Sequence, residues 1–424
     1  MARAQFVWLH RWTGLLMVGF LVLEGVTGSV LAVRRLVEEL VTPELFAVHR
    51  SGASPLSLAV LAERAEALTP EARVGYFWVD DRQAVMRMLP RVNGTATLAF
   101  DHLFLDPWTG QELGRRLDGD LSQGLINFVP FLYRLHMNLA LGDAGTLVLG
   151  IVALAWTLDC FLGLYLTLPR ATAHFLRRWK PAWTLKYPAP AVRVNYDIHR
   201  SGGLWLWPLL FVFGWSSVMF NLPAVYEPVT ARLFDYRSDL DLLKNPPLHP
   251  NATPHLAWGD AERRGAELMA RTAKLEGFNI LHPYGMAYIP EFGVYTYAVA
   301  SDVNIEAHGW ATSLWLDGDT GDLVSVDLPR REPRGNFIGL WLRAIHFADL
   351  RDSVMYRLLV CMVGLVVAAL SITGAYIWLK KRRARRLSHA KVARRNALPG
   401  DSRATARAPA GNDAVRTHPP GRNY

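Results

Sequence analysis

Four of the 13 histidines fall at matching places in the two halves of the chain. The stretches LHRWTG at 9–14 and IHRSGG at 198–203 each place His-Arg just before a long apolar run. The stretch YRLHMNL, with His136, aligns with LRAIHFADL, with His346. Neutral imidazole is a good ligand for iron and other transition metals near pH 7. These four histidines are therefore the first candidates for a metal or cofactor site.

Four apolar runs approach or exceed the length that crosses a bilayer, which is about 20 residues. They lie at 13–33, 146–168, 204–222 and 355–379, in a chain that is 51% hydrophobic. The sequence therefore predicts a polytopic membrane protein. We expect the first run to be a span and not a cleaved secretory signal, because its internal counterpart at 204–222 cannot be a signal.

Lys and Arg residues predict the orientation of the spans. They crowd the segment 169–198 and follow the last run as KKRRARR at 380–386, and cytoplasmic flanks collect these residues. We therefore expect both termini and the 169–198 loop inside, and the connections 34–130 and 223–340 outside. This placement accounts for the net charge of +9, so we expect contact with membrane lipid and no nucleic-acid partner.

The two halves of the chain repeat one another. Aligning His10 with His199 places Gly14 on Gly203, and LFLDPWTGQELG at 103–114 aligns with LWLDGDTGDLVS at 314–325. Each half therefore reads as an outgoing span, an outer α+β unit and a returning span. Helices are expected at 53–68 and 259–275, and strands at VGYFWVD, AVMRML, GVYTYAVAS and SLWLD. The D-x-x-T-G pattern predicts a tight turn with Gly at positive φ.

The predicted fold is a four-helix transmembrane bundle, built from a tandem repeat, with two outer α+β domains. Because the spans alternate in direction, His10 and His199 fall at the inner end and His136 and His346 at the outer end. Packing about a pseudo-two-fold axis would give one facing pair of imidazoles in each layer, and facing imidazoles can bind haem iron axially. Structural anchoring at span ends is the plainer alternative. Zinc is a weaker one, because no carboxylate or thiolate is matched alongside.

The charged residues near these histidines have more than one possible role. Arg11 and Arg200 each follow a histidine of the inner pair, His10 and His199. They are equally consistent with contact to haem propionates and with anchoring by the positive-inside rule. Glu24 and Asp159 lie within predicted spans, where a carboxyl has to be paired, protonated or turned toward a polar interior. Since Glu24 aligns with Phe213, this asymmetry argues against an essential part in a two-haem arrangement.

The duplicated order of span, outer unit and span, the LDPWTG and LDGDTG turns, and the histidines at the span ends resemble the PepSY-associated transmembrane family. The resemblance covers nearly the whole chain apart from the tail. It implies an iron-regulated protein of the bacterial inner membrane with two PepSY-like periplasmic domains. It also implies a di-haem reductase of ferric siderophores, in which His10, His199, His136 and His346 are the axial ligands of two b-type haems.

The predicted domain boundaries follow the repeat. They are transmembrane span 1 at 1–34, periplasmic PepSY-like domain 1 at 35–130, span 2 with a periplasmic extension at 131–169, a basic cytoplasmic loop at 170–198, span 3 at 199–222, PepSY-like domain 2 at 223–338, span 4 with a periplasmic extension at 339–380, and a basic disordered tail at 381–424.

Two functions remain open. In the first, electrons cross from the inner to the outer haem and reduce a ferric siderophore between the outer domains, with no protein acid or base. Because no glycine-rich nucleotide motif precedes a helix in a suitable context, a separate cytoplasmic reductase or a quinol has to supply the electrons. In the second, the chain is a non-enzymatic PepSY-type sensor or accessory protein for iron or siderophore uptake.

Several aromatic residues and histidines are secondary candidates. An aromatic relay between the layers is expected to come from a set of five tryptophans, Trp12, Trp156, Trp205, Trp207 and Trp215. A substrate surface is expected to draw on residues near the outer layer, namely Trp108, Tyr133, Trp310, Trp341, His282 and His308. Both cysteines lie inside predicted spans, so the outer domains carry no disulfide, and the absence of CxxCH excludes c-type haem.

Overall fold

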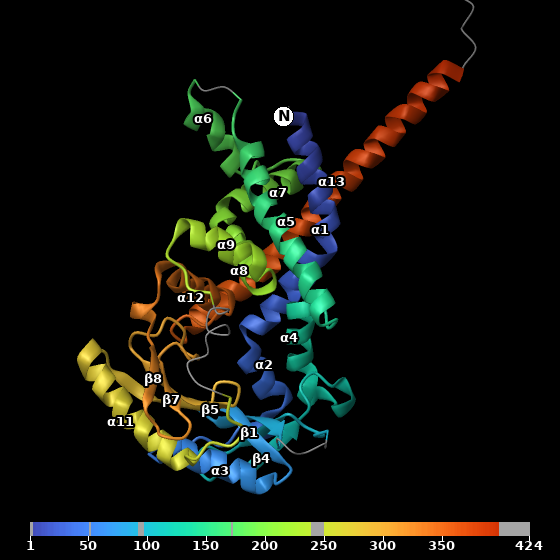
Figure 1. The fold of residues 1–424 in the computed structure, drawn as a ribbon. Helices are drawn as coiled ribbons and strands as arrows, with labels where there is room; N and C mark the ends of the chain where they lie inside the picture. The colour runs from blue at the N-terminus through green and yellow to red at the C-terminus, as the bar shows by residue number, and fades with distance from the viewer. Residues whose placement is uncertain (1–2, 51, 92–96, 171–172, 239–249, 398–424) are drawn as a thin grey trace, which may run out of the picture. The chain divides into compact units, whose positions relative to one another are not determined.

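The structure is a computed structural model that describes residues 3–50, 52–91, 97–170, 173–238 and 250–397. The chain divides into two compact units, Met1–Ile377 and Trp378–Tyr424. The first unit contains packed apolar helices and an antiparallel sheet (Figure 1). Residues 398–424 of the predicted tail lie outside the described residues.

Among the described residues, three single helices are long and apolar enough to cross a membrane. They are α1 (Arg3–Ala32), α5 (Asp143–Thr167) and α13 (Val354–Ala397). The first two agree with the predicted spans. The tail was predicted to be disordered from 381, but α13 continues to Ala397 because its Ala, Arg, Lys and Leu residues are strong helix formers.

The third predicted span is not a straight helix. It consists of α7 (Ala191–Trp205) and α8 (Trp207–Asn221), which meet at an angle of 69°. Pro208 has no N–H to donate, and its ring clashes with the carbonyl of Leu204, so the helix breaks just before it. With 15 residues, α8 is only about 22 Å long. By length and composition the described residues therefore contain three candidate spans, or four if the bent pair is one span.

Shorter elements connect these helices to one another and to the sheet. They are α2 (Arg34–Val41), η1 (Pro43–Leu45), η2 (Leu121–Gln123), η3 (Leu125–Asn127), α4 (Phe128–Asn138), α6 (Phe175–Trp179), η4 (Lys180–Trp183), α9 (Pro223–Leu233), η5 (Pro329–Arg331) and α12 (Arg334–His346).

The sheet has eight antiparallel strands in the order β4-β3-β2-β1-β5-β6-β7-β8. The strands are β1 (Ala72–Asp80), β2 (Gln83–Pro90), β3 (His102–Leu105), β4 (Glu112–Arg116), β5 (Ile280–Ile289), β6 (Val294–Ser301), β7 (Ser313–Asp317) and β8 (Leu323–Asp327). The two repeats meet where β1 pairs with β5, with Phe77 opposite Met286. The two predicted α+β domains therefore share one sheet.

The helices α3 (Leu58–Leu68) and α11 (Trp258–Glu276) cover this sheet, close to their predicted positions. Their apolar residues and those of the strands form one buried core, which includes Leu61, Phe77, Met269 and Met286. The predicted turns are also confirmed, with Gly110 at φ +67° and Gly321 at φ +74°. In each turn an aspartate oxygen accepts backbone N–H groups, which shows a structural role.

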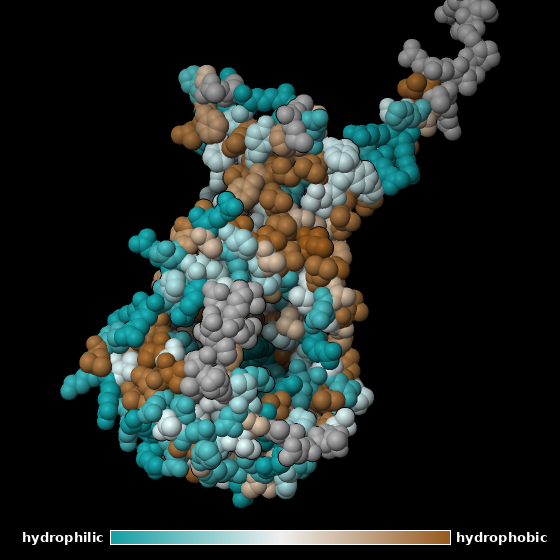
Figure 2. Space-filling model, in the orientation of Figure 1, coloured by the Kyte–Doolittle hydropathy of each residue, from teal (hydrophilic) through white to brown (hydrophobic). Residues whose placement is uncertain are grey.

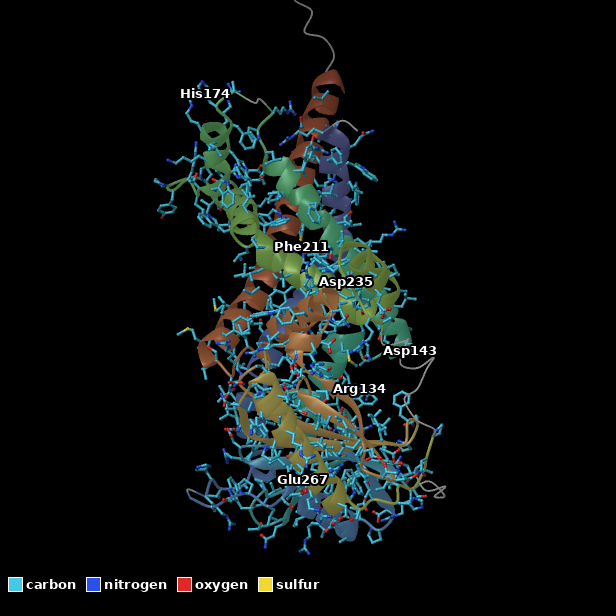
Figure 3. The ribbon with its side chains drawn as sticks, turned by 60° about the vertical axis from the view of Figure 1, so that its left-hand side comes forward. Arg134, Asp143, His174, Phe211, Asp235 and Glu267 are labelled. Atoms are coloured by element: carbon cyan, nitrogen blue, oxygen red, sulfur yellow. The ribbon has the colours of Figure 1, made fainter. Side chains whose placement is uncertain are left out.

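The apolar helices pack through small residues. A Cβ on Gly25 of α1 would lie 2.5 Å from the Gly364 carbonyl oxygen of α13, and Ser29 Oγ donates to the Cys361 carbonyl at 2.8 Å. Small residues allow such close backbone approach between membrane helices. Hydrophobic side chains gather over these helices, whereas the sheet is mostly hydrophilic on the face that Figure 2 shows. His174 and Glu267 mark the helical end and the sheet end of this unit (Figure 3).

Candidate functional site

The structure brings together the four repeat-matched histidines in two pairs. The basic-side pair, next to the basic segment 169–198, is His10 of α1 and His199 of α7, with ring centroids 6.3 Å apart. The sheet-side pair is His136 of α4 and His346 of α12, the helices that follow the last strand of each repeat, with ring centroids 6.2 Å apart. Two imidazoles that bind one metal atom from opposite sides hold their centroids about 6 Å apart, because each metal–nitrogen bond is about 2 Å. Both spacings fit an iron atom between the rings.

In the basic-side pair, hydrogen bonds occupy Nδ1 of both rings. His10 Nδ1 lies 2.9 Å and 3.0 Å from the two carboxyl oxygens of Asp159, which is 8% exposed. His199 Nδ1 donates to the Leu370 carbonyl oxygen at 3.0 Å. When Gly163 is aligned with Gly374, Asp159 falls on Leu370. The same repeat position therefore supplies a carboxylate in one half and a backbone carbonyl in the other.

In the sheet-side pair, hydroxyl groups hold the two rings at equivalent repeat positions. Thr27 Oγ1 lies 2.9 Å from His136 Nδ1, and Ser216 Oγ lies 2.8 Å from His346 Nδ1. Both hydroxyls donate to carbonyls of their own helix, so they accept from Nδ1–H. Glu24 Oε2 also lies 2.9 Å from His136 Nδ1.

These contacts fix one tautomer in all four rings. A proton on Nδ1 leaves the lone pair on Nε2, and a ligating histidine usually donates its other N–H to a carboxylate or a carbonyl. Among the described residues, no hydrogen bond engages Nε2 of these four rings. The donor set therefore fits haem iron, with one free Nε2 from each ring.

Glycines make room for the rings. A Cβ on Gly374 would lie 3.1 Å from His199 Cε1, and one on Gly163 would lie 3.6 Å from His10 Cε1. These two glycines occupy equivalent positions in GLYL and GAYI. On the sheet side, a Cβ on Gly28 would lie 3.0 Å from His136 Cε1.

A cavity of about 360 Å³ adjoins the sheet-side pair. It is mostly apolar, and its lining includes both histidines, Glu24, Trp156 and Phe213. Glu24 Oε1 is buried and has no hydrogen-bond partner among the described residues. Trp156 lines the cavity and precedes Asp159, the partner of His10, by about one turn of α5.

The two arginine candidates, Arg11 and Arg200, have different partners in the structure. Arg200 Nη2 donates to the Pro181 carbonyl at 2.6 Å and to Asp197 at 2.9 Å, so it has structural partners. The buried Nε of both arginines has no hydrogen-bond partner among the described residues, and Arg11 lies over the Trp12 ring at 5.4 Å. Because Arg200 already pairs with the carboxylate of Asp197, Arg11 fits an anionic cofactor group better than Arg200 does.

The remaining sequence candidates lie in two places. Tyr133 lines the sheet-side cavity, whereas Trp108, His282 and His308 line a separate pocket in the sheet part of the chain. Trp310 packs against Tyr284 at 6.0 Å. Within the described residues, no three His, Cys, Asp or Glu side chains gather to hold a metal ion, which gives zinc no complete ligand set there.

The sequence marked Glu24 and Asp159 as carboxyls inside apolar runs that need a polar partner, but it did not show which residue that partner is. Because these two carboxyls have no matched counterpart in the repeat, their contacts with the histidine pairs were not predicted. In both cases that partner is a histidine of the first half of the chain.

These features define a membrane-associated helical protein that carries an antiparallel sheet and two facing pairs of histidines. The model of the PepSY-associated TM region matches residues 7–381, so the chain belongs to this family. An uncharacterized protein of Pseudomonas aeruginosa is 25% identical over 272 residues, which are 60% of this chain and 64% of the relative. The match therefore spans less than two thirds of the relative's length.

Proposed function

We propose that this protein carries electrons across the bacterial inner membrane through two b-type haems and reduces a ferric siderophore, or a similar ferric chelate, in the periplasm. The observation that carries the proposal is the geometry of the two histidine pairs. Both pairs combine a centroid spacing near 6 Å with Nδ1 atoms that are already hydrogen-bonded. A single histidine at a span end needs neither feature if it only anchors the span.

Each haem would be held by one histidine from each half of the chain. His10 and His199 would hold one, His136 and His346 would hold the other, and Arg11 would pair with a propionate of the first. When bound, these groups supply reversible one-electron transfer. The protein's own residues fix the ligand tautomer, exclude water and set the distance between the two sites.

The path between the sites is long. A rise of 1.5 Å per residue puts His10 and Gly28, which contacts His136, about 27 Å apart along α1. Trp156 lies on this path, because it lines the sheet-side cavity one turn from the partner of His10. We therefore assign Trp156, of the five tryptophans considered, as the aromatic relay.

The proposed orientation places the sheet in the periplasm and both termini in the cytoplasm, with the bent pair α7–α8 as a fourth span. The basic segment 169–198 and the basic end of α13 support it through the positive-inside rule. A separate cytoplasmic reductase or a quinol would donate electrons near the basic-side pair. No protein acid or base is required, because reduction alone weakens the hold of hard oxygen donors on iron.

The visible spectrum of the purified full-length protein tests this function. We expect the bands of b-type haem, sharpened on reduction by dithionite, and reoxidation when a ferric chelate is added. His10→Ala should remove about half of the haem, and the matched control His174→Ala, an exposed histidine outside both pairs, should retain all of it. A protein without haem would favour the alternative of a PepSY-type sensor or accessory protein.

A further inference from the structure

The cavity beside the sheet-side pair has a polar end and an apolar end. Contacts with the two histidine pairs give the direction of the helices that line it: α1 and α8 run toward the sheet side, and α5 runs away from it. The lining residues at the sheet end are Arg34, Thr146 and Asn221. Farther from the sheet, on the same three sides, they are Leu21, Trp156 and Phe213. Haem is two-ended in the same way, because its two anionic propionates extend from one edge of an otherwise apolar ring.

Opposite charges lie on the two sides of the sheet-side pair along this cavity. Gly28 of α1 lies beside the His136 ring. At 1.5 Å per residue, Glu24 lies about 6 Å before Gly28, and Arg34 lies about 9 Å after it, toward the sheet. Glu24 Oε1 is buried and has no hydrogen-bond partner among the described residues. An anionic group in this cavity is therefore repelled at the Glu24 end and attracted at the Arg34 end.

The guanidinium of Arg34 is not occupied by a protein acid. Arg34 is the exposed first residue of α2, and no hydrogen bond or ion pair engages it among the described residues. In contrast, Arg35 Nη1 donates to Asp80 Oδ1 at 2.7 Å. Arg343, three residues before His346, places its Nε 3.0 Å from Glu306 Oε1. Arg34 therefore lacks the acid partner that each of these two arginines has.

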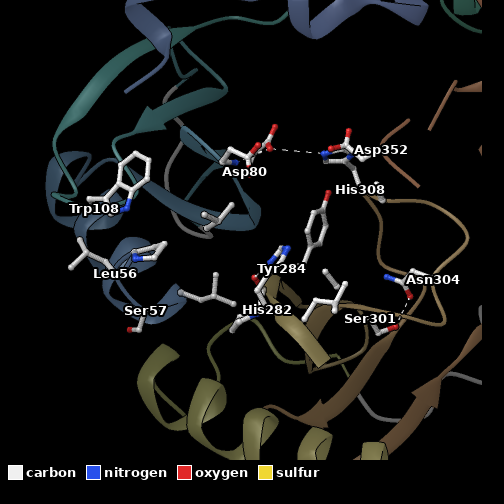
Figure 4. Close-up of a pocket in the computed structure, with 18 of the residues that line it drawn as sticks. Leu56, Ser57, Asp80, Trp108, His282, Tyr284, Ser301, Asn304, His308 and Asp352 are labelled. Carbon is white, nitrogen blue, oxygen red and sulfur yellow. Dashed lines mark hydrogen bonds and ion pairs between the residues drawn. The ribbon is translucent and has the colours of Figure 1, made fainter. Parts of the chain in front are cut away.

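The positive charge of Arg34 also lies close to the sheet. Burial raises the pKa of Tyr284, Asp80 and Asp349 add to this shift, and Arg34 and Arg343 oppose it. Tyr284 and Asp80 belong to the separate pocket in the sheet part of the chain (Figure 4). Arg34 is thus at the boundary between the sheet-side cavity and the sheet, which is where a charged group avoids the apolar interior.

We propose that Arg34 binds a propionate of the haem at the sheet-side pair and turns the propionate edge of that haem toward the sheet. This inference rests on the proposed function, because it concerns the haem that His136 and His346 would hold. Guanidinium and carboxylate groups can form two parallel hydrogen bonds, which fix direction as well as charge. The opposite, apolar edge of the ring then lies at Phe213 and Trp156, on the side of the basic-side pair.

Haem dimethyl ester, in which both propionates are esterified, distinguishes a propionate contact from a general structural role. Release of haem from the full-length protein to excess apomyoglobin should show two phases, one for each site. Arg34→Gln should accelerate one phase roughly tenfold, because charge-assisted hydrogen bonds are among the strong ones. When the protein is loaded with the ester instead, Arg34→Gln and the wild type should release it at the same rate.

Two variants complete the test. Arg34→Lys keeps the positive charge and should restore part of the slow release. Arg271→Gln, at an exposed arginine of α11 outside the cavity lining, should leave both phases unchanged.

A redox titration gives a second readout. Arg34→Gln should lower the midpoint potential of one haem and leave the other unchanged, because a nearby positive charge stabilises the reduced form. Unchanged release and potentials in Arg34→Gln, or equal acceleration with haem and with its ester, would overturn the inference. A wild-type protein that contains no haem would overturn the proposed function itself.

Discussion

His10 Nδ1 and Asp159 Oδ1 lie 2.9 Å apart in the apolar helices, although the matched contact in the second repeat uses a backbone carbonyl. A carboxylate that accepts Nδ1–H increases the electron donation of the imidazole to a metal. The two ligands of the basic-side pair are therefore chemically different. The same holds for the sheet-side pair, where Glu24 accompanies the first-repeat histidine alone.

Replacing Asp159 by Asn should raise the midpoint potential of one haem. The amide keeps a hydrogen-bond acceptor for His10 but removes the negative charge, so the oxidised iron is less stabilised. Spectroelectrochemical titration should show one shifted and one unshifted component. Asp143→Asn, at the exposed first residue of α5, is the control, and unchanged potentials in Asp159→Asn would contradict this role.

Replacing Gly374 by Val should abolish haem binding at the basic-side pair. The new side chain would press on His199, because even a Cβ would lie 3.1 Å from its ring. Haem content should fall to about half of the wild-type value, measured as the pyridine complex. Gly19→Val is the matched control, because a Cβ there meets nothing within 4 Å. Equal haem loss in both variants would point to general damage to the helices.

Replacing Trp156 by Leu should slow electron transfer between the two sites while both haems remain bound. The change removes the aromatic group on the proposed path and keeps an apolar side chain in the cavity. Stopped-flow reoxidation by a ferric chelate should show one fast component and one component slowed at least several-fold. Trp205→Leu, at a tryptophan that is 67% exposed, should leave both components unchanged. Similar kinetics in the two variants would exclude Trp156 as the relay.

Titration of the Glu306 carboxyl should make the free energy of unfolding depend on pH. Burial raises the pKa of the Glu306 carboxyl from 4.5 to about 7, with Arg343 opposing and Asp349 adding to the shift. Because the folded state binds the proton more tightly, the free energy of unfolding should be highest below about pH 4.5 and fall by up to about 3 kcal/mol toward pH 7.

Glu306→Gln should remove this part of the pH dependence. The hydrogen bond to Asp349 also raises the pKa of His308, and its contribution is likewise lost as pH rises, so the comparison with the variant isolates Glu306. Thermal midpoints in detergent, followed by circular dichroism, provide the measurement. Parallel pH curves for the two proteins would show that Glu306 does not contribute.

The repeat made much of this site predictable from the sequence. His10, His199, His136 and His346 could be paired because the same residue type recurs at equivalent positions in both halves. The turn glycines Gly110 and Gly321 were predictable for the same reason. The histidine pairs and the turn glycines can therefore be predicted from local patterns and internal symmetry, without knowledge of tertiary contacts.

Other features depend on contacts that the sequence does not mark. The pairing of β1 with β5 joins strands that are far apart in the chain, so the local strand pattern predicted two separate domains. Pro208 was a local signal for the break in the helix, but the continuous apolar run at 204–222 favoured a single straight span. Asp159 and Glu24 have no repeat counterpart, so the symmetry of the chain did not indicate which histidine each of them contacts.

The pairing of β1 with β5 has an evolutionary consequence. A chain with only one repeat would expose its β1 or β5 strand as an unpaired edge of the sheet. Two copies of such a chain could complete the sheet as a symmetric homodimer. In such a dimer every residue occurs twice, so both histidines of a pair would carry the same partner. Fusion of the two copies into one chain frees each half to diverge, which allows Asp159 and Glu24 to be present once each.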